Sequence, residues 1–274
     1  MGKLFLYPHS NIFITKVYFA AMNIQLQGKK VFFASDFHLG APDETSSKKR
    51  EKRILHWLDS IEHEAAAIFL VGDIFDFWFE YNKVIPKGFV RFLGKVADLR
   101  DKNIPVIFFT GNHDLWMQDY FEKELDVPVH HHPIQLKIEG KNFLIGHGDG
   151  LGPGDAQYKI LKQIFTNRIA KWLFRWLHPD IGVWLAQKWS SNSRISKIQK
   201  NENDFKGEDE WLWQYCHQVE KNQHFDYYVF GHRHIPLDLP VGEKSRYFNL
   251  GEWVSQYTYG VFDGKQFEIK SLEG

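Results

Sequence analysis

Five short motifs place Asp, Asn or His directly after apolar runs of the sequence. In chain order the motifs are Asp36-Phe37-His38, Gly72-Asp73-Ile74-Phe75-Asp76, Gly111-Asn112-His113-Asp114, Gly146-His147-Gly148-Asp149 and Gly231-His232-Arg233-His234. Each motif alone is more typical of turn-forming Asp or Asn and of an isolated core His. Together they offer enough oxygen and imidazole ligands for two metal ions that share one carboxylate, so the chain is a candidate two-metal hydrolase.

The candidate ligands sort into two neighbouring sites joined by Asp73, because a carboxylate has two oxygens and can bridge two cations. The first site would use Asp36, His38, Asp73 and His234, and the second Asp73, Asn112, His147 and His232. Such mixed nitrogen and oxygen ligands suit Mn²⁺, Fe²⁺ or Zn²⁺ better than Ca²⁺. Gly72 would let the backbone approach this centre closely.

Three residues of the motifs are predicted to act on the substrate. Two cations about 3.5–4 Å apart can clamp the oxygens of a phosphate for in-line attack, and Asn112 would help to position that phosphate. His113 is not needed as a ligand, so we expect it to assist the departing or non-bridging oxygen; a structural histidine is the alternative. Asp76 would orient His113, although a helix N-cap is an equal alternative. Asp114 and Asp149 are interpreted as loop-organising residues.

Each motif follows an apolar run that is typical of a buried strand. The runs cover residues 30–35, 66–71, 104–110, 142–145 and 226–230. Helix-spaced apolar residues over 47–63 and 87–102 separate the first three runs, which predicts an α/β fold with parallel strands and a ligand site beyond their carboxyl ends. Residues 247–270, with a turn at Asp263-Gly264, predict antiparallel strands that complete a second sheet.

Length and composition exclude several classes of protein. The 274 residues, 43% of them apolar, fit one large domain or two small ones. The formal net charge of zero gives no global attraction to nucleic acid, so no nucleic-acid partner is expected and a nuclease lacks its usual basic surface. The single cysteine, Cys216, excludes an intramolecular disulfide and a cysteine-based zinc site and favours a reducing compartment.

Residues 1–25 are interpreted as an N-terminal extension outside the core, and residues 26–274 as the catalytic domain. Polar residues interrupt the apolar stretches of the extension, so it contains neither a span of about 20 apolar residues nor the pattern of a signal peptide. Met22 is a candidate for the working start of translation. No other segment is long and apolar enough to cross a bilayer.

Residues of about 156–220 interrupt the strand–helix alternation and predict a helical insertion over the metal face. Between residues 161 and 185, Trp, Phe and Leu alternate with Lys and Arg on more than one helix face, which favours contact with acyl chains or a membrane surface over packing on the domain itself. Arg194 and Lys197 are candidates to hold a nucleotide or phosphate, with a solvated face as the alternative. His130-His131-His132 is interpreted as a solvated loop.

The five motifs, in this order over residues 36–234, resemble those of the calcineurin-like metallophosphoesterase superfamily. The resemblance implies a four-layer α/β-β/α sandwich with two metal ions held by the ligand sets given above. Further segments resemble UDP-2,3-diacylglucosamine diphosphatases, above all their Bacteroidetes-type members. These segments are Phe75-Asp76-Phe77-Trp78, Gly148-Asp149-Gly150-Leu151, Gly152-Pro153-Gly154-Asp155, residues 172–179 and Asn249-Leu250-Gly251-Glu252-Trp253.

The second resemblance implies hydrolysis of the pyrophosphate bond of UDP-2,3-diacylglucosamine to lipid X and UMP in lipid A biosynthesis, by metal-bridged hydroxide attack on the α-phosphorus. It also implies a manganese-dependent peripheral enzyme on the cytoplasmic face of the inner membrane, whose insertion holds the acyl chains. Asp155 and Tyr158 would help to place this lipid-linked nucleotide. The best-known branch carries Arg at the position of His113 and Glu at that of Asp76, which leaves the exact substrate and the treatment of the leaving group open.

Two other functions stay open at this point. A general metal-dependent phosphodiesterase or phosphoprotein phosphatase would hydrolyse bis-p-nitrophenyl phosphate or a phosphopeptide faster than the lipid nucleotide. A non-catalytic metal-binding scaffold would be inactive on every phosphodiester, and the complete ligand set together with His113 argues against it.

Overall fold

Two mixed β-sheets form the centre of the computed structural model, which describes residues 18–153, 156–185, 188 and 204–272. The β2 sheet contains, in spatial order, β12 (Phe267–Ser271), β11 (Thr258–Phe262), β2 (Lys30–Ala34), β3 (Ala65–Val71), β4 (Val106–Phe109) and β5 (Val129–His130). The β7 sheet contains β1 (Tyr18–Ile24), β6 (Ile134–Ile138), β7 (Lys141–Gly146), β8 (Tyr227–Phe230), β10 (Arg246–Leu250) and β9 (Pro236–Pro240). The inner faces of the two sheets share one apolar cluster, in which Phe33 stacks on Phe69 and Phe143.

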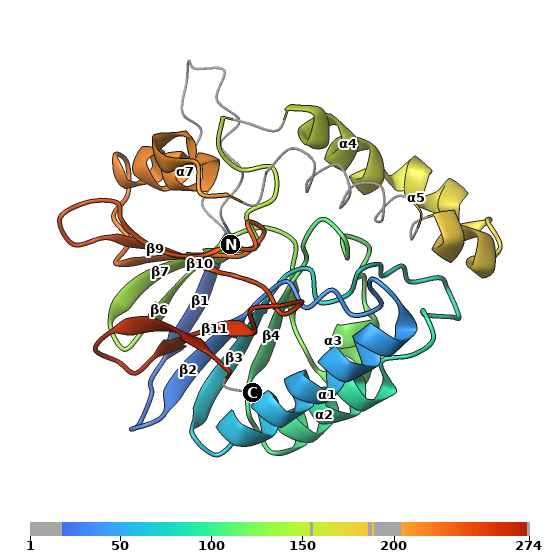
Figure 1. Ribbon diagram of the computed structural model, residues 1–274, viewed down its shortest axis with the longest axis horizontal. Helices are drawn as coiled ribbons and strands as arrows, with labels where there is room; N and C mark the ends of the chain where they lie inside the picture. The colour runs from blue at the N-terminus through green and yellow to red at the C-terminus, as the bar shows by residue number, and fades with distance from the viewer. Residues whose placement is uncertain (1–17, 154–155, 186–187, 189–203, 273–274) are drawn as a thin grey trace.

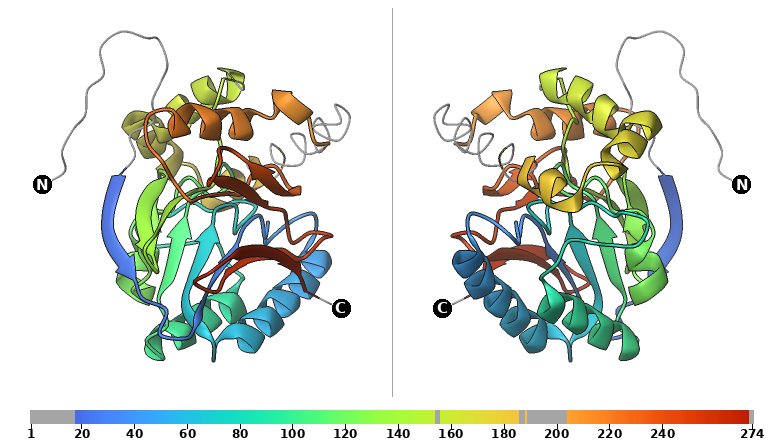
Figure 2. Two further views of the ribbon diagram at one scale, coloured as in Figure 1. Left: turned by 90° about the vertical axis from the view of Figure 1, so that its left-hand side faces the viewer. Right: turned by 90° about the vertical axis from the view of Figure 1, so that its right-hand side faces the viewer.

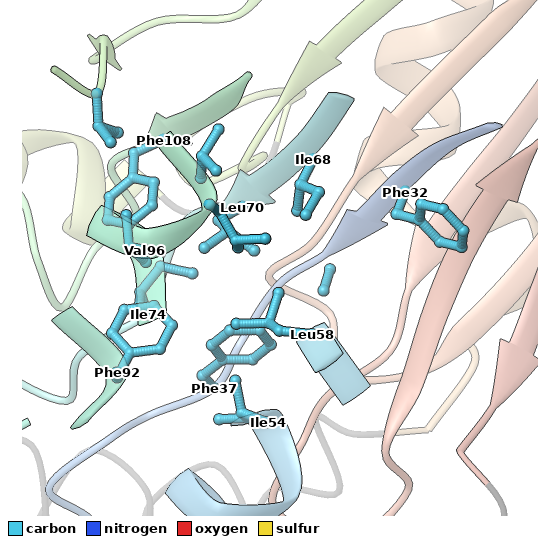
Figure 3. Packing of buried hydrophobic residues seen from close by; sticks show 14 of the residues in the cluster. Phe32, Phe37, Ile54, Leu58, Ile68, Leu70, Ile74, Phe92, Val96 and Phe108 are labelled. Atoms are coloured by element: carbon cyan, nitrogen blue, oxygen red, sulfur yellow. The ribbon is translucent and has the colours of Figure 1, made fainter. Parts of the chain in front are cut away.

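Helices cover the outer face of each sheet (Figure 1). Against the β2 sheet lie α1 (Glu44–Ile61), α2 (Val90–Asp101) and α3 (Tyr120–Leu125), which connect the parallel strands β2 to β5. Asp43 begins α1 by accepting a hydrogen bond from the Ser46 amide. Figure 3 shows the apolar side chains of α1, α2, β3 and β4 gathered in one cluster. With α7 (Trp211–Glu220) on the β7 sheet, the chain has the predicted four layers.

The insertion lies over the carboxyl ends of the central strands, as Figures 1 and 2 show. It contains α4 (Ala156–Thr166), α5 (Arg168–Arg175) and a helical stretch over 179–185. Asn167 begins α5 by accepting hydrogen bonds from the amides of Ile169 and Ala170. Among the residues that the structure describes, no helix combines the length and the apolar character needed to span a bilayer.

Three segments differ from the sequence-based expectation, each through long-range packing. Tyr18–Ile24, expected outside the core, adds the edge strand β1 to β6, where its backbone groups find partners. The β11–β12 hairpin joins β2 instead of completing the other sheet. Helix α7 falls within the range expected for the insertion, but its buried Leu212 and Cys216 pack on the β7 sheet as part of the core. The division into residues 1–25 and 26–274 stays a prediction.

Candidate metal centre

The loops that follow the central strands hydrogen-bond to one another and bring the five motifs to one place. The Asp36 amide donates to the Gly72 carbonyl at 3.0 Å, and the His38 amide donates to the Asp73 carbonyl at 2.9 Å. Strands β7 and β8 run parallel in the second sheet, and just beyond them the Gly231 amide donates to the His147 carbonyl at 3.0 Å. Because parallel strands end at the same edge, motifs far apart in the sequence become neighbours.

Five of the predicted ligands have left-handed backbone conformations, which non-glycine residues rarely adopt. The φ angles are 56° at Asp36, 45° at His38, 52° at Asp73, 71° at His232 and 56° at His234. Such a residue costs of order 1–3 kcal/mol, and this kind of strain concentrates at functional sites. The turns let Asp36 and His38 face one point, although alternate residues of an extended strand face opposite sides.

The predicted ligands form two groups that share Asp73. The ligand atoms of Asp36, His38, Asp73 and His234 lie within 4.8 Å of one another, and so do those of Asp73, His147 and His232. His234 Nε2 lies 3.0 Å from Asp36 Oδ1, and His147 Nε2 lies 3.3 Å from Asp73 Oδ2. The shared carboxylate is therefore placed where a bridge between two ions would need it.

Polar atoms of this cluster are buried without the partners that buried groups ordinarily have. Asn112 Oδ1 and His147 Nε2 accept or donate no hydrogen bond among the described residues. Burial alone would lower the pKa of His147, but the Asp73 carboxylate raises it to about 10. Burial alone would also lower the pKa of His38, but hydrogen bonds that its ring donates to the Asp36 and Asp76 carboxylates raise this pKa to about 9. The cluster thus favours positive charge inside it, and these donors fit divalent metal ions.

Two glycines permit the close approach of the motif loops. A Cβ on Gly72 would lie 2.5 Å from His147 Nδ1, and Gly72 also has a φ of 85°. A Cβ on Gly111 would overlap the Asp73 carboxylate. The expectation that Gly72 allows close backbone approach is confirmed.

His113 and Asp76 lie beside the first ligand group. His113 Nδ1 is 3.1 Å from the backbone carbonyl of Asp76, and the Asp76 Oδ1 atom lies 3.6 Å from both His113 Nδ1 and His38 Nδ1. Asp76 thus orients the His113 ring through its backbone carbonyl more closely than through its carboxylate. The N-cap alternative for Asp76 is wrong, because the next helix along the chain, α2, begins after Phe89.

The buried carboxylates of Asp114 and Asp149 join the motif loops to their surroundings. Asp114 accepts hydrogen bonds from the amides of Gly111, Ile74 and Phe75, so it ties two motifs together. Burial and the neighbouring Asp73 charge raise the pKa of Asp114 to about 7. Asp149 lies 2.5 Å from Lys162 Nζ of α4. Both sets of contacts fit the predicted loop-organising role. The ion pair between Lys162 and Asp149 was not predicted, because no local sequence pattern links these two residues.

Replacing Asp114 with Ala is expected to destabilise the fold. The change leaves three backbone amides without their acceptor in a buried place, and each such loss costs about 1–3 kcal/mol. We expect a fall of about 3 kcal/mol in the free energy of unfolding, measured by urea denaturation. Asp101→Ala, at an exposed position, is the control; equal stability of the two variants would contradict the loop-joining role of Asp114.

A cavity of about 1090 Å³ lies between the centre and the insertion. It reaches the predicted ligand His147 on one side and α4 and α5 on the other. Apolar residues of its wall are Phe109, Leu115, Met117, Pro133 and Leu151, and its lysines are Lys159, Lys162 and Lys171. His130, His131 and His132 also line it. His131 and His132 are exposed, as expected for a solvated loop, but His130 is partly buried and belongs to β5, so that interpretation is wrong for His130.

The predicted substrate residues of the insertion are placed only in part. Asp155, Arg194 and Lys197 lie outside the described residues. Tyr158 belongs to α4, on the side of the molecule where the large cavity lies, but its side chain is not among those described. Their roles in substrate binding stay predictions.

Comparison with known proteins gives a family match and several curated relatives. Residues 29–236 match the family described as "Calcineurin-like phosphoesterase". A "UDP-2,3-diacylglucosamine hydrolase" of Porphyromonas gingivalis is 39% identical over 256 residues, which cover 89% of this chain and 98% of the relative. A protein of the same name from Shewanella pealeana is 26% identical over 229 residues, covering 83% of this chain and 91% of the relative.

Proposed function

Because the chain belongs to the calcineurin-like phosphoesterase family, we propose that it hydrolyses the pyrophosphate bond of UDP-2,3-diacylglucosamine to UMP and lipid X. The observation that carries the proposal is the 39% identity with the Porphyromonas gingivalis hydrolase, which extends over 98% of that protein. Supporting it, the Asp and His groups that such chemistry requires are complete in this chain. This reaction belongs to lipid A biosynthesis.

The two ligand groups would hold two divalent metal ions. Asp36, His38, Asp73 and His234 would bind one ion, and Asp73, Asn112, His147 and His232 the other. Mn²⁺ is the proposed metal, because imidazole nitrogens and carboxylate or amide oxygens together suit it. When bound, such ions lower the pKa of water and offset charge that develops on a phosphate.

The neighbouring side chains would orient the substrate and move the proton. Asn112 and the His113 amide, which donates to Asp73 Oδ1 at 2.8 Å, belong to one tight turn over the shared carboxylate. Asp76 holds His113 through the contact at Nδ1, so the Nε2 atom would serve the leaving phosphate oxygen of lipid X. Attack at the α-phosphorus then transfers the water oxygen to UMP.

The large cavity would receive the acyl chains. Its wall contains apolar side chains from β4, from the loop after it and from the segment just after the fourth motif, and α4 and α5 cover it. Phe165 and Phe174 of the insertion contact Trp116 of the core, and Trp116 Nε1 donates to the Phe165 carbonyl at 2.7 Å. The insertion is therefore attached beside the cavity by aromatic contacts and one hydrogen bond.

The proposed activity is tested by comparing substrates. The purified protein with Mn²⁺ is expected to release UMP and lipid X from UDP-2,3-diacylglucosamine much faster than it hydrolyses bis-p-nitrophenyl phosphate. Faster turnover of the simple diester would favour a general phosphodiesterase. Metal-loaded protein that is inactive on both would favour a binding scaffold.

The exposed face of α5 supports a peripheral location on the cytoplasmic face of the inner membrane. Trp172 is 56% and Trp176 75% exposed, and their rings lie 6.0 Å apart. Ile169 and Leu173 of the same helix are exposed as well. Contiguous exposed apolar side chains mark interaction surfaces, and tryptophan suits the boundary between lipid headgroups and acyl chains. A lipid surface next to the acyl cavity would supply the substrate.

The double variant Trp172→Ala/Trp176→Ala is expected to lower binding to phosphatidylglycerol-containing vesicles about tenfold, measured by sedimentation. Trp211, which is 37% exposed on α7, provides the matched control Trp211→Ala. Equal vesicle binding by the double variant and the wild type would remove the membrane role of α5.

A further inference from the structure

A second cavity lies against Asp76, which neighbours the candidate metal centre. Its volume is about 770 Å³, and Asp76 forms part of its lining. The Asp76 carboxylate lies 3.6 Å from both His38 and His113, so this one residue separates the cavity from the first ligand group. The large cavity instead reaches the centre at His147. A substrate with two arms joined at a pyrophosphate needs a space on each side of the cleaved bond.

We propose that the smaller cavity binds the nucleoside monophosphate arm of the substrate, an inference that rests on the proposed function. Its wall comes from segments far apart in the sequence: the loop after His38, the first turns of α1, the loop before α2, and the insertion at Trp184 and Lys188. It therefore forms only when the insertion lies against the core.

The core side of this cavity is held rigidly. The Gly40 amide donates to Ser47 Oγ at 2.7 Å, and the buried Arg50 donates to the Ala41 carbonyl. Phe89 has a φ of 57°, which is strained for an aromatic residue, and its ring lies 5.0 Å from Phe75. A wall that is fixed before binding loses little entropy when a ligand arrives.

The wall of this cavity carries charges of both signs, from Asp43, Glu44, Glu51 and Asp76 and from Lys48, Lys87 and Lys188. Among its acids, Asp43 accepts from the Ser46 amide, and Glu51 accepts from the Phe92 amide. Glu44 is paired with Lys48 at 2.6 Å. Lys87 and Lys188 also line the cavity, and neither forms an ion pair with a described residue. These two lysines can donate to the ribose or uracil oxygens of a nucleotide whose phosphate lies at the metal centre.

Trp184 adds a surface for a flat base. Its side chain is 57% exposed, and Lys188 Nζ lies 5.1 Å from the ring centroid. An indole and a lysine at the edge of a polar cavity suit a stacked nucleobase and its ribose. The large cavity has more apolar residues in its wall and lies nearer the exposed tryptophans of α5, which suits the acyl chains. The two arms are thereby assigned to different cavities.

The test measures UMP binding to the metal-loaded protein by calorimetry, with inorganic phosphate as a second probe. Trp184→Ala is expected to raise the Kd for UMP about tenfold, as loss of base stacking does, and Lys87→Ala should raise it several-fold. Neither variant should change the Kd for phosphate, because phosphate contacts the metal centre alone. Matched controls are Trp211→Ala, whose ring also lies near a lysine, and Lys83→Ala, an exposed lysine outside the cavity.

Several outcomes would overturn the assignment. The first is an unchanged Kd for UMP in both Trp184→Ala and Lys87→Ala. The second is weaker UMP binding in Lys171→Ala, a variant of the large cavity, when Trp184→Ala and Lys87→Ala bind UMP as the wild type does. If the wild type hydrolyses UDP-2,3-diacylglucosamine but Trp184→Ala leaves the Kd for UMP unchanged, the cavity assignment is wrong and the proposed function is supported. If hydrolysis is absent while UMP binding depends on Trp184, the nucleotide cavity stands and the proposed function falls.

Discussion

Replacing Asp73 with Asn is expected to remove bound metal from both sites and to lower hydrolysis of UDP-2,3-diacylglucosamine by about 1,000-fold or more. Asp73 belongs to both ligand groups, and its carboxylate lies near imidazoles of each. The amide keeps the shape of the side chain but has neither its charge nor its second acceptor oxygen. Loss of several kcal/mol of charge stabilisation corresponds to this fall in rate.

Metal content is the measurement that separates this effect from unfolding. Elemental analysis should give about two metal ions per wild-type chain and fewer than one per Asp73→Asn chain. Asp101→Asn, a substitution of an exposed acid at the end of α2, should retain both metal and activity. Full metal content in Asp73→Asn, with its fold verified by circular dichroism, would show that Asp73 does not bridge two sites.

Replacing His113 with Ala is expected to lower kcat by about 10²–10⁴-fold while metal content stays unchanged. The contact between His113 and Asp73 runs through the backbone amide, at 2.8 Å to Asp73 Oδ1, and alanine keeps that amide. The lost group is the imidazole that Asp76 orients. The prediction therefore separates a side chain that moves a proton from one that binds metal.

Two further variants define the role of His113. His113→Gln should be nearly as slow as His113→Ala, because glutamine cannot donate and accept a proton near neutral pH. His56→Ala, which removes an exposed histidine from α1, should behave as the wild type does. Loss of metal in His113→Ala would make His113 a ligand or a structural residue, and an unchanged kcat would exclude it from the proton transfer.

The position of the centre follows from local features of the sequence. Short apolar runs that end in Asp, Asn or His predict parallel strands, and parallel strands of one sheet bring their carboxyl ends together. Asp36, Asp73 and Asn112 follow the neighbouring strands β2, β3 and β4. The histidines after β7 and β8 could be grouped with them because their motifs also follow apolar runs typical of buried strands.

Other features depend on packing that no local pattern contains. Edge strand β1 and the β11–β12 hairpin join their sheets through partners distant in the sequence. Within the insertion, Phe174 turns toward Phe79 and Trp116, whereas Trp172 and Trp176 face outward, and hydrophobicity alone cannot separate these side chains. The two cavities are likewise made by segments that meet only in the folded chain.

The most direct measurement is hydrolysis of UDP-2,3-diacylglucosamine in ¹⁸O-labelled water with Mn²⁺, followed by mass spectrometry of both products. Attack at the α-phosphorus predicts one ¹⁸O atom in UMP and none in lipid X. Label in lipid X would place the attack on the other phosphorus. Absence of both products from protein whose metal content has been verified would contradict the proposed function itself.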